Sequence, residues 1–255
     1  MDTVTAIYRY PVKGLSGEKL DSIHLEAGRE LAGDRAFAIA HGTAPFDPTA
    51  PKPLAKSHFL MLMRNERIAG LETAYDPATG MLTIARNGRQ VARGNLNQPI
   101  GRKLVEQFFK DFLGDEIRGM PRVVQAAGHH FADVDLPLVS LINMASVRDL
   151  ERVAHRPIHP LRFRGNIYLE GARPWQEFDW LNRTVAVDDA RLKVIARIER
   201  CAATDVDPET ALRDMSIPQT LKRAFGHVDM GVYAQVEASG SVAPGDVVQL
   251  LNSGS

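Results

Sequence analysis

The fold is decided by the segment Arg191-Leu-Lys-Val-Ile-Ala-Arg-Ile-Glu-Arg-Cys-Ala-Ala-Thr-Asp-Val-Asp-Pro-Glu-Thr210. Apolar and charged side chains alternate from Arg191 to Glu199, which predicts a strand with one buried face. The loop after this strand is rich in hydroxyl and carboxylate groups and contains Cys201, the only cysteine of the chain. Because loops at strand ends are accessible and rigidly supported, this loop is a candidate functional site.

Strand patterns recur on both sides of this segment. In the first hundred residues, β-branched and aromatic runs predict strands over 4–10, 20–26 and 35–40. Two hairpins are indicated, one around residues 76–80 and one around Asn87-Gly88, a dipeptide typical of two-residue turns. Further strands are predicted over 183–187, 230–237 and 247–251.

Three segments have the spacing of helices. The first is Ile100 to Leu113, with Gly114 as its stop. Its predicted apolar face consists of Ile100, Leu104, Val105, Phe108, Phe109 and Phe112. Asn143 is placed to cap a helix over 144–154, and residues 218–225 form a short helix before a glycine. Strands therefore outnumber helices, and the fold class is predicted to be α+β and predominantly β.

The domain boundary is expected where the first long helix ends. Residues 114–122 contain two glycines and a proline, so we predict an N-terminal domain over 1–118 and a second domain over 119–252. The alternative is a single domain that carries an insertion at this point.

Composition excludes several classes of protein. The chain has 255 residues, with 31 Lys and Arg against 31 Asp and Glu, so its net charge gives no general attraction to nucleic acid or anionic membranes. A single cysteine excludes an internal disulfide, a multi-cysteine zinc site and an iron–sulfur cluster. The longest uncharged stretch, 136–147, is too short to span a bilayer, and no signal peptide is evident. We therefore expect a cytoplasmic protein with no membrane span and no nucleic-acid partner.

Cys201 has two interpretations from the residues alone. The neighbouring Arg200 would favour the thiolate, which attacks electrophiles and binds soft metals. A lone intracellular cysteine is also commonly a small buried hydrophobic residue. Both interpretations stay open at this point.

Several cations lie at the ends of predicted strands. Arg162, Arg164 and Asn166 have the same parity, so they would face the same way at the start of an apolar strand. Lys13-Gly14 and Gly33-Asp34-Arg35 occupy two further strand–loop junctions. Such a set suits an anion, because guanidinium groups match phosphate geometry. The alternative for each is an ordinary surface charge or salt bridge.

These motifs together carry a family resemblance. They are Tyr10-Pro11-Val12-Lys13-Gly14, Gly33-Asp34-Arg35, Ala145-Ser146-Val147, Arg162-Phe163-Arg164-Gly165-Asn166, Arg200-Cys201 with Thr204, 206–210, and Gly231-Val232-Tyr233. In this order and spacing, the chain resembles the MOSC superfamily in its two-part form. It is similar to the mitochondrial amidoxime-reducing members and their bacterial relatives. The resemblance implies an N-terminal β-barrel-like domain followed by a β-barrel MOSC domain with a few short helices.

The resemblance also implies a cofactor and a reaction. Cys201 would ligate the metal of the molybdenum cofactor (Mo-molybdopterin), whose dithiolene supplies two more sulfurs. Lys13, Gly14, Arg35 and Arg164 would hold its phosphate, and Ser146 and Asn166 would hydrogen-bond around it. Thr204 would shape the cysteine loop, and Asp205 is a candidate proton donor. The reaction implied is a two-electron reduction of N-hydroxylated small molecules from N–OH to N–H, with the oxygen removed at molybdenum.

Some positions depart from the family pattern. Gly14 stands where serine is frequent, Gly165 where proline is usual, and Ala211 where glycine is usual. The chain has no cysteines to spare for a ferredoxin domain, so a separate electron-donor protein of flavin, ferredoxin or cytochrome type is expected. Two alternatives remain, a cysteine persulfide sulfur carrier in cofactor metabolism and a non-catalytic molybdopterin-binding module.

Overall fold

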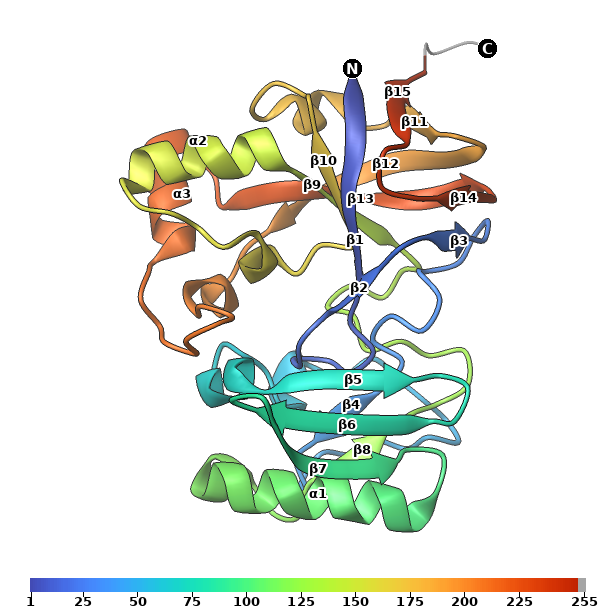
Figure 1. Ribbon diagram of the computed structural model, residues 1–255, viewed down its shortest axis with the longest axis vertical. Helices are drawn as coiled ribbons and strands as arrows, with labels where there is room; N and C mark the ends of the chain where they lie inside the picture. Colours follow the sequence, from blue (N-terminus) through green and yellow to red (C-terminus); the bar gives the residue numbers. More distant parts are fainter. Residues whose placement is uncertain (252–255) are drawn as a thin grey trace.

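The computed structural model describes residues 1–251 and has an upper and a lower lobe (Figure 1). In the upper lobe, seven strands close into a barrel. In order around the barrel they are β1 (Asp2–Arg9), β10 (Ile167–Glu170), β9 (Val139–Asn143), β13 (Asp229–Ala238), β12 (Ala190–Glu199), β11 (Thr184–Val187) and β15 (Val247–Leu250). The first strand closes the barrel because it pairs with both β10 and β15. The β9–β10 pair is parallel, and the other pairs around the barrel are antiparallel.

The barrel core is built from the inward faces of these strands. The alternation predicted for 191–199 is seen in β12, where Leu192 and Val194 are buried and Lys193 lies on the outer face. Val4 and Ile7 of β1 belong to the same core, although they precede the next barrel strand by more than a hundred residues. The barrel therefore combines two distant parts of the chain.

The lower lobe is a smaller unit with its own core. Its antiparallel sheet has the order β5 (Glu72–Asp76), β6 (Met81–Arg86) and β7 (Arg89–Asn95). A second pair joins β4 (Ala38–Ala40) to β8 (Arg122–Val124), and α1 (Pro99–Leu113) packs along β7. Phe37, Leu60, Ile84 and Phe109 are among the buried residues that fill the space between these elements.

The remaining elements are short strands and 3₁₀ turns. The strand β2 (Glu18–Leu20) extends from β1, and β3 (Ile23–Leu25) pairs with β14 (Gly240–Val242). The 3₁₀ turns are η1 (Lys56–His58), η2 (Glu66–Gly70), η3 (Gly114–Glu116), η4 (Pro160–Phe163), η5 (Gln176–Trp180) and η6 (Ala202–Asp205).

Three features predicted from local sequence are present in the structure. Asn143 caps α2 (Met144–Ala154) by accepting a hydrogen bond from the Ala145 amide at 3.0 Å, and α3 (Ile217–Phe225) ends at Gly226. Asn87 and Gly88 have φ values of 52° and 71°, as a two-residue hairpin turn between β6 and β7 requires. A mostly β fold with few helices is confirmed.

The predicted apolar face of α1 is partly correct, since Phe108 and Phe112 also pack against the lower-lobe core. Val105 and Phe109 are buried as expected, but Ile100 and Leu104 are 70% and 57% exposed. The cause is Gly101, because a Cβ at this position would lie 2.2 Å from the Asn95 carbonyl oxygen. The helix therefore meets β7 along the row that contains Gly101, Val105, Phe109 and Leu113.

Among residues 1–251, no helix combines the length and apolar character needed to cross a bilayer. The cytoplasmic location stays a prediction.

Candidate functional site

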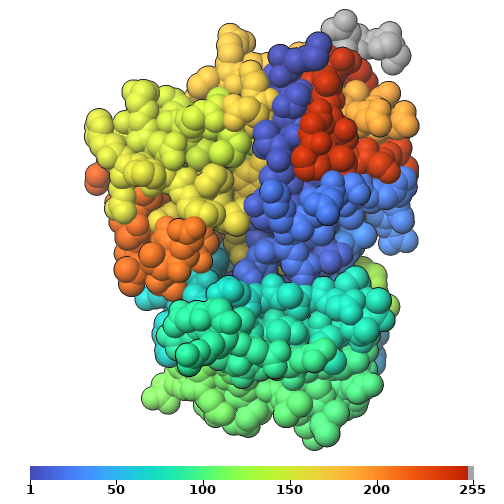
Figure 2. Space-filling model, viewed as in Figure 1, coloured from blue at the N-terminus to red at the C-terminus, as the bar shows by residue number. Residues whose placement is uncertain are grey.

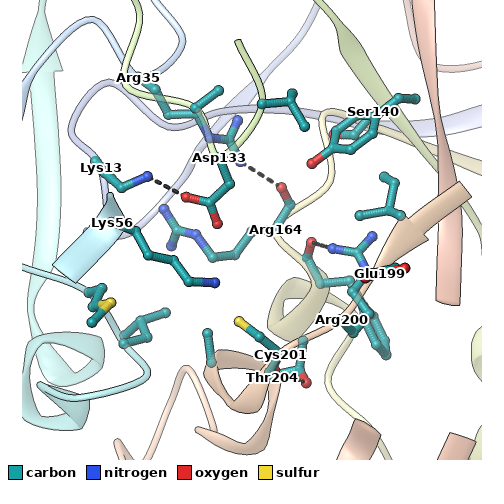
Figure 3. A pocket seen from close by; sticks show the side chains of 18 of the residues that line it. Lys13, Arg35, Lys56, Asp133, Ser140, Arg164, Glu199, Arg200, Cys201 and Thr204 are labelled. Carbon is teal, nitrogen blue, oxygen red and sulfur yellow. Dashed lines mark hydrogen bonds and ion pairs between the residues drawn. The ribbon is translucent and has the colours of Figure 1, made fainter. Parts of the chain in front are cut away.

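A cavity of about 510 Å³ lies where the two lobes meet, and the only thiol of the chain opens into it (Figure 3). Seven of the residues predicted for the site line this cavity. They are Lys13, Gly14, Arg35, Arg164, Asn166, Cys201 and Thr204. Residues from the first half of the chain and from the second half thus line one pocket, as expected for a groove between the two halves.

Cys201 is partly exposed and lies directly before η6. The strand β12 ends two residues earlier, and Arg200 fixes this end by donating to the Met230 carbonyl at 2.9 Å and the Phe163 carbonyl at 2.8 Å. Thr204 closes the loop, since its hydroxyl and its amide both donate to the Cys201 carbonyl, at 2.9 and 3.0 Å. Thr204 therefore shapes the cysteine loop and has its hydroxyl committed to the backbone.

Two arginines are stacked on one aromatic ring at the opposite side of the pocket. The guanidinium carbons of Arg164 and Arg35 lie 4.3 and 4.8 Å from the centre of the Tyr10 ring. Arg35 forms an ion pair with Asp34 and donates to the Arg164 carbonyl at 3.0 Å, and Arg164 donates to the Leu15 carbonyl at 2.7 Å. Both arginines have positive φ, 50° and 48°, a backbone conformation that is uncommon for residues other than glycine.

Lys13 is the third cation of this group. Its ammonium donates to the Phe131 carbonyl at 2.8 Å and to Asp133 Oδ1 at 2.5 Å. Asp133 is half exposed, and the chain holds it over the pocket beside Arg164 (Figure 3).

Burial and crowding shape the electrostatics of the pocket. Burial lowers the pKa of Arg164 and of Arg200 to about 10, so both remain charged near neutral pH. Burial likewise lowers the pKa of Lys13, although Asp133 opposes this effect. Partial burial acts to raise the pKa of Asp133, but Lys13, Lys56 and Arg35 outweigh it and hold that pKa below its usual value. The site is thus a permanently cationic pocket with a thiol on one wall.

Asn166 lines the pocket but its amide is occupied by the barrel. Its side-chain oxygen accepts from the Ser140 amide at 3.1 Å and hydroxyl at 2.7 Å, and its nitrogen donates to the Tyr8 carbonyl at 3.2 Å. The residue joins β9, β1 and the start of β10, and this role supports the pocket wall.

Two of the three departures from the family pattern have local reasons. Gly14 has a φ of 83°, and a Cβ there would come within 3.0 Å of the Leu60 carbonyl oxygen. At Gly165, a Cβ would lie 2.2 Å from Ile142, and the amide donates to the Tyr168 hydroxyl at 3.1 Å, which proline could not do. Ala211 has a φ of 58°, which glycine adopts more easily than alanine, so the structure does not explain this third departure.

Two predicted residues do not reach the pocket, and their expected roles are corrected here. Ser146 is fully buried; its hydroxyl donates to Glu177 and accepts from the Trp175 amide at 2.8 Å. Asp205 accepts from the Ile217 amide at 2.8 Å and so anchors the start of α3. Both side chains are used by neighbouring elements and do not line the cavity.

Several other lining residues were not predicted for the site. Lys56 and the segment Met61–Met63 come from the lower lobe, Asp133 comes from a loop, and Tyr233 comes from β13. The Gly231-Val232-Tyr233 motif could have pointed to Tyr233, but neither Lys56 nor Asp133 belongs to a pattern. Tertiary packing alone brings them to the site.

Comparisons with known proteins agree with the resemblance found in the motifs. The chain is 31% identical to mitochondrial amidoxime-reducing component 1 of Mus musculus over 123 residues, which are 44% of this chain and 36% of that protein. It is 28% identical to mitochondrial amidoxime reducing component 2 of Rattus norvegicus over 126 residues, 45% of this chain and 37% of that protein. The matched part spans little more than a third of the length of these curated relatives.

A solved structure is also similar. The YUAD protein from Bacillus subtilis matches 97% of this chain and 94% of its own, with a TM-score of 0.45 and 13% identity. Family comparisons match residues 1–133 to the MOSC N-terminal beta barrel domain and residues 128–249 to the MOSC domain. Since these two matches cover nearly the whole chain, the protein belongs to the MOSC family.

Proposed function

We propose that the chain is a molybdenum-cofactor-dependent reductase of N-hydroxylated compounds. The observation that carries this proposal is the meeting of Cys201 with Lys13, Arg35 and Arg164 in one pocket, although they are spread over nearly two hundred residues of sequence. MOSC domains are associated with binding of the molybdenum cofactor. The names of the curated relatives, amidoxime-reducing components, suggest the substrate class.

The residues of the pocket fit the cofactor. A thiol is a suitable ligand for a soft metal, and the buried guanidinium groups opposite it are suitable for a phosphate. The volume of about 510 Å³ lies in the range of pockets that enclose a small ligand. Within residues 1–251, no cluster of three His, Cys, Asp or Glu side chains could hold a metal ion. The remaining ligands would therefore be those of the cofactor.

When bound, the cofactor supplies the two-electron redox chemistry. Cys201 would hold the metal, Arg35 and Arg164 would bind the phosphate through their remaining donors, and Lys13 would add charge. The Gly14 backbone would line the phosphate site without a side chain. The Tyr10 ring, which both guanidinium groups contact, keeps the donors oriented before the ligand arrives.

The reduction of N–OH to N–H and water consumes two electrons and two protons. Asp205 lies outside the pocket, and Asp133 is held ionised by Lys13, so neither carboxyl group suits the role of proton donor. Burial raises the pKa of Tyr233, so its phenol keeps a proton at neutral pH inside the pocket. Its hydroxyl can therefore donate a hydrogen bond to a bound ligand. The electrons would come from a separate donor protein of flavin, ferredoxin or cytochrome type.

The experiment compares wild type with Cys201→Ala, both produced in cells that make the molybdenum cofactor. We expect near-stoichiometric molybdenum in the wild type and a loss of at least about tenfold in the variant. With a chemical reductant, the wild type should convert benzamidoxime to benzamidine. If the wild type contains no metal and carries a cyanide-labile sulfur, the reductase proposal fails and the protein is a sulfur carrier. Molybdenum without turnover would favour a cofactor-binding module.

A further inference from the structure

Lys56 is a pocket cation that the proposed cofactor site does not use. It lies on η1 of the lower lobe, is half buried, and lines the same cavity as Cys201. Among the residues that the structure describes, its ammonium has no hydrogen bond or ion pair with any side chain or carbonyl. It nevertheless lies close enough to Asp133 to contribute to the low pKa of that carboxyl group.

The other cations around the cavity are already held. Lys13 is fixed by Phe131 and Asp133, Arg35 by Asp34, and Arg164 by Leu15. Arg200 is bound to two backbone carbonyls. These groups form a preorganised site, whereas Lys56 keeps a flexible stem and an unused point charge.

The position of Lys56 suits a ligand that approaches the thiol. Figure 3 shows its side chain extending into the pocket, with its amino group directed to the side where Cys201 lies. The segment that follows η1 contributes Met61, Leu62 and Met63 to the same wall, and Val134 and Leu138 add apolar surface. A ligand with an apolar body and one anionic end would match this combination.

We propose that Lys56 binds a carboxylate of the substrate, so that the natural substrates are N-hydroxylated compounds that carry a carboxyl group. The inference rests on the proposed function, because it concerns the molecule that the same pocket reduces. A carboxylate is favoured over a phosphate, since it carries a single negative charge that one free ammonium balances, whereas a phosphate group carries nearly two. The bound cofactor would also reach the thiol, so the test includes the pterin content of Lys56→Met, which would fall if Lys56 contacted the cofactor.

The test measures binding without any reductant, so that it does not depend on turnover. The ligands are benzamidoxime and 4-carboxybenzamidoxime, titrated by calorimetry into wild-type protein with its cofactor, Lys56→Met and Lys52→Met. Lys52 is exposed, lies four residues earlier and does not line the cavity, so it controls for the loss of one charge.

We expect Lys56→Met to weaken binding of the carboxylated ligand by about tenfold, the effect of one hydrogen bond to a charged group. Binding of the neutral ligand should change by less than about twofold, and Lys52→Met should resemble the wild type. Equal losses for both ligands would overturn the proposal, as would a wild type with no preference for the carboxylate.

A loss of pterin from Lys56→Met would overturn it too, because Lys56 would then belong to the cofactor site. Pterin content is measured by fluorescence after oxidation of the released cofactor. If the carboxylated ligand binds through Lys56 and neither ligand is reduced, the reductase proposal fails and the binding assignment stands.

Discussion

At the scale of the residue, the buried carboxyl group of Glu177 binds the hydroxyl of Ser146, the residue that the family resemblance assigned to the cofactor. It is fully buried, and its oxygens accept from the Asn143 amide at 2.7 Å and from the Ser146 hydroxyl at 2.8 and 2.9 Å. The same serine and asparagine lie at the start of α2. This network therefore joins the start of α2 to η5, which contains Glu177.

Glu177 should make stability depend on pH in an unusual direction. Burial raises its pKa above the ordinary value of 4.5, although the Asn143 and Ser146 hydrogen bonds oppose the rise. Above pH 4.5 the unfolded chain releases this proton while the folded chain keeps it, so the folded state binds more protons. The free energy of unfolding should then fall as pH rises from 4.5 to the folded pKa, and level off above it.

The measurement is urea unfolding of wild type and Glu177→Gln between pH 4 and pH 8. The difference between them should decrease across this window by about 1.4 kcal/mol for every tenfold difference between the acid dissociation constants of the two states. Glu26→Gln, at an exposed position, controls for the loss of one charge. If the difference in unfolding free energy between the two proteins stays constant or grows with pH, the pKa of Glu177 is not raised in the folded state.

At the scale of the element, the cysteine loop is tied to the lower lobe by Arg213. Its guanidinium donates to the Ala202 carbonyl at 2.6 Å on one side, and to the Leu62 and Met63 carbonyls at 3.2 and 3.1 Å on the other. Glu66 completes the contact at 3.2 Å. In Figure 2 the orange part of the chain that contains η6 meets the turquoise lower lobe on the left side. Arg213 thus connects the two walls of the pocket beside Cys201.

Removing this connection should expose the thiol. In cofactor-free protein, Arg213→Met should raise the rate of Cys201 alkylation by iodoacetamide about tenfold, as expected if opening of the loop becomes about 1.4 kcal/mol easier. Because Cys201 is the only cysteine, mass spectrometry of the intact chain reports this one site. The control is Arg223→Met, an exposed arginine on α3. An unchanged rate in Arg213→Met would mean that the loop holds its place without the arginine.

The elements show which features the sequence could predict. The strand at 191–199 and the cap at Asn143 have local causes, alternation in one case and a single side chain in the other, and both predictions are confirmed. The face of α1 was predicted only in part, because Gly101 lies close to the Asn95 backbone while Ile100 and Leu104 stay exposed, and no periodicity encodes such a contact.

The same distinction applies to the pocket. Lys13, Arg35 and Arg164 lie in motifs at strand ends, so their meeting with Cys201 could be anticipated. Ser146 was assigned to the cofactor by its motif, but a buried acid 31 residues away occupies its hydroxyl. Lys56 reaches the pocket only because the lower lobe packs under the barrel, and its own segment carries no signal of this.

At the scale of the whole molecule, the first strand decides how the two halves depend on each other. The predicted boundary between residues 118 and 119 would leave β1 with the lower lobe, yet β1 pairs with β10 and β15 and buries Val4 and Ile7 in the barrel. Without it, two barrel strands would each present an unpaired edge, which is a site of aggregation. Residues 119–251 alone would contain six of the seven strands of the barrel.

We therefore expect the fragment 119–251 to lack a cooperative unfolding transition and to fold when residues 1–118 are co-expressed, with β1 completing the barrel across two chains. The halves should co-purify, and circular dichroism of the pair should show one thermal transition. A shorter first fragment, 10–118, lacks β1 but keeps Val12, Leu15 and the lower-lobe elements other than β8, so it should fail to rescue the barrel. In the same way, Ile7→Asp in the fragment 1–118 should prevent association, because it would put a charge into the barrel core. If 119–251 unfolds cooperatively by itself, closure by β1 is dispensable, and the boundary at 118 and 119 separates two independent domains.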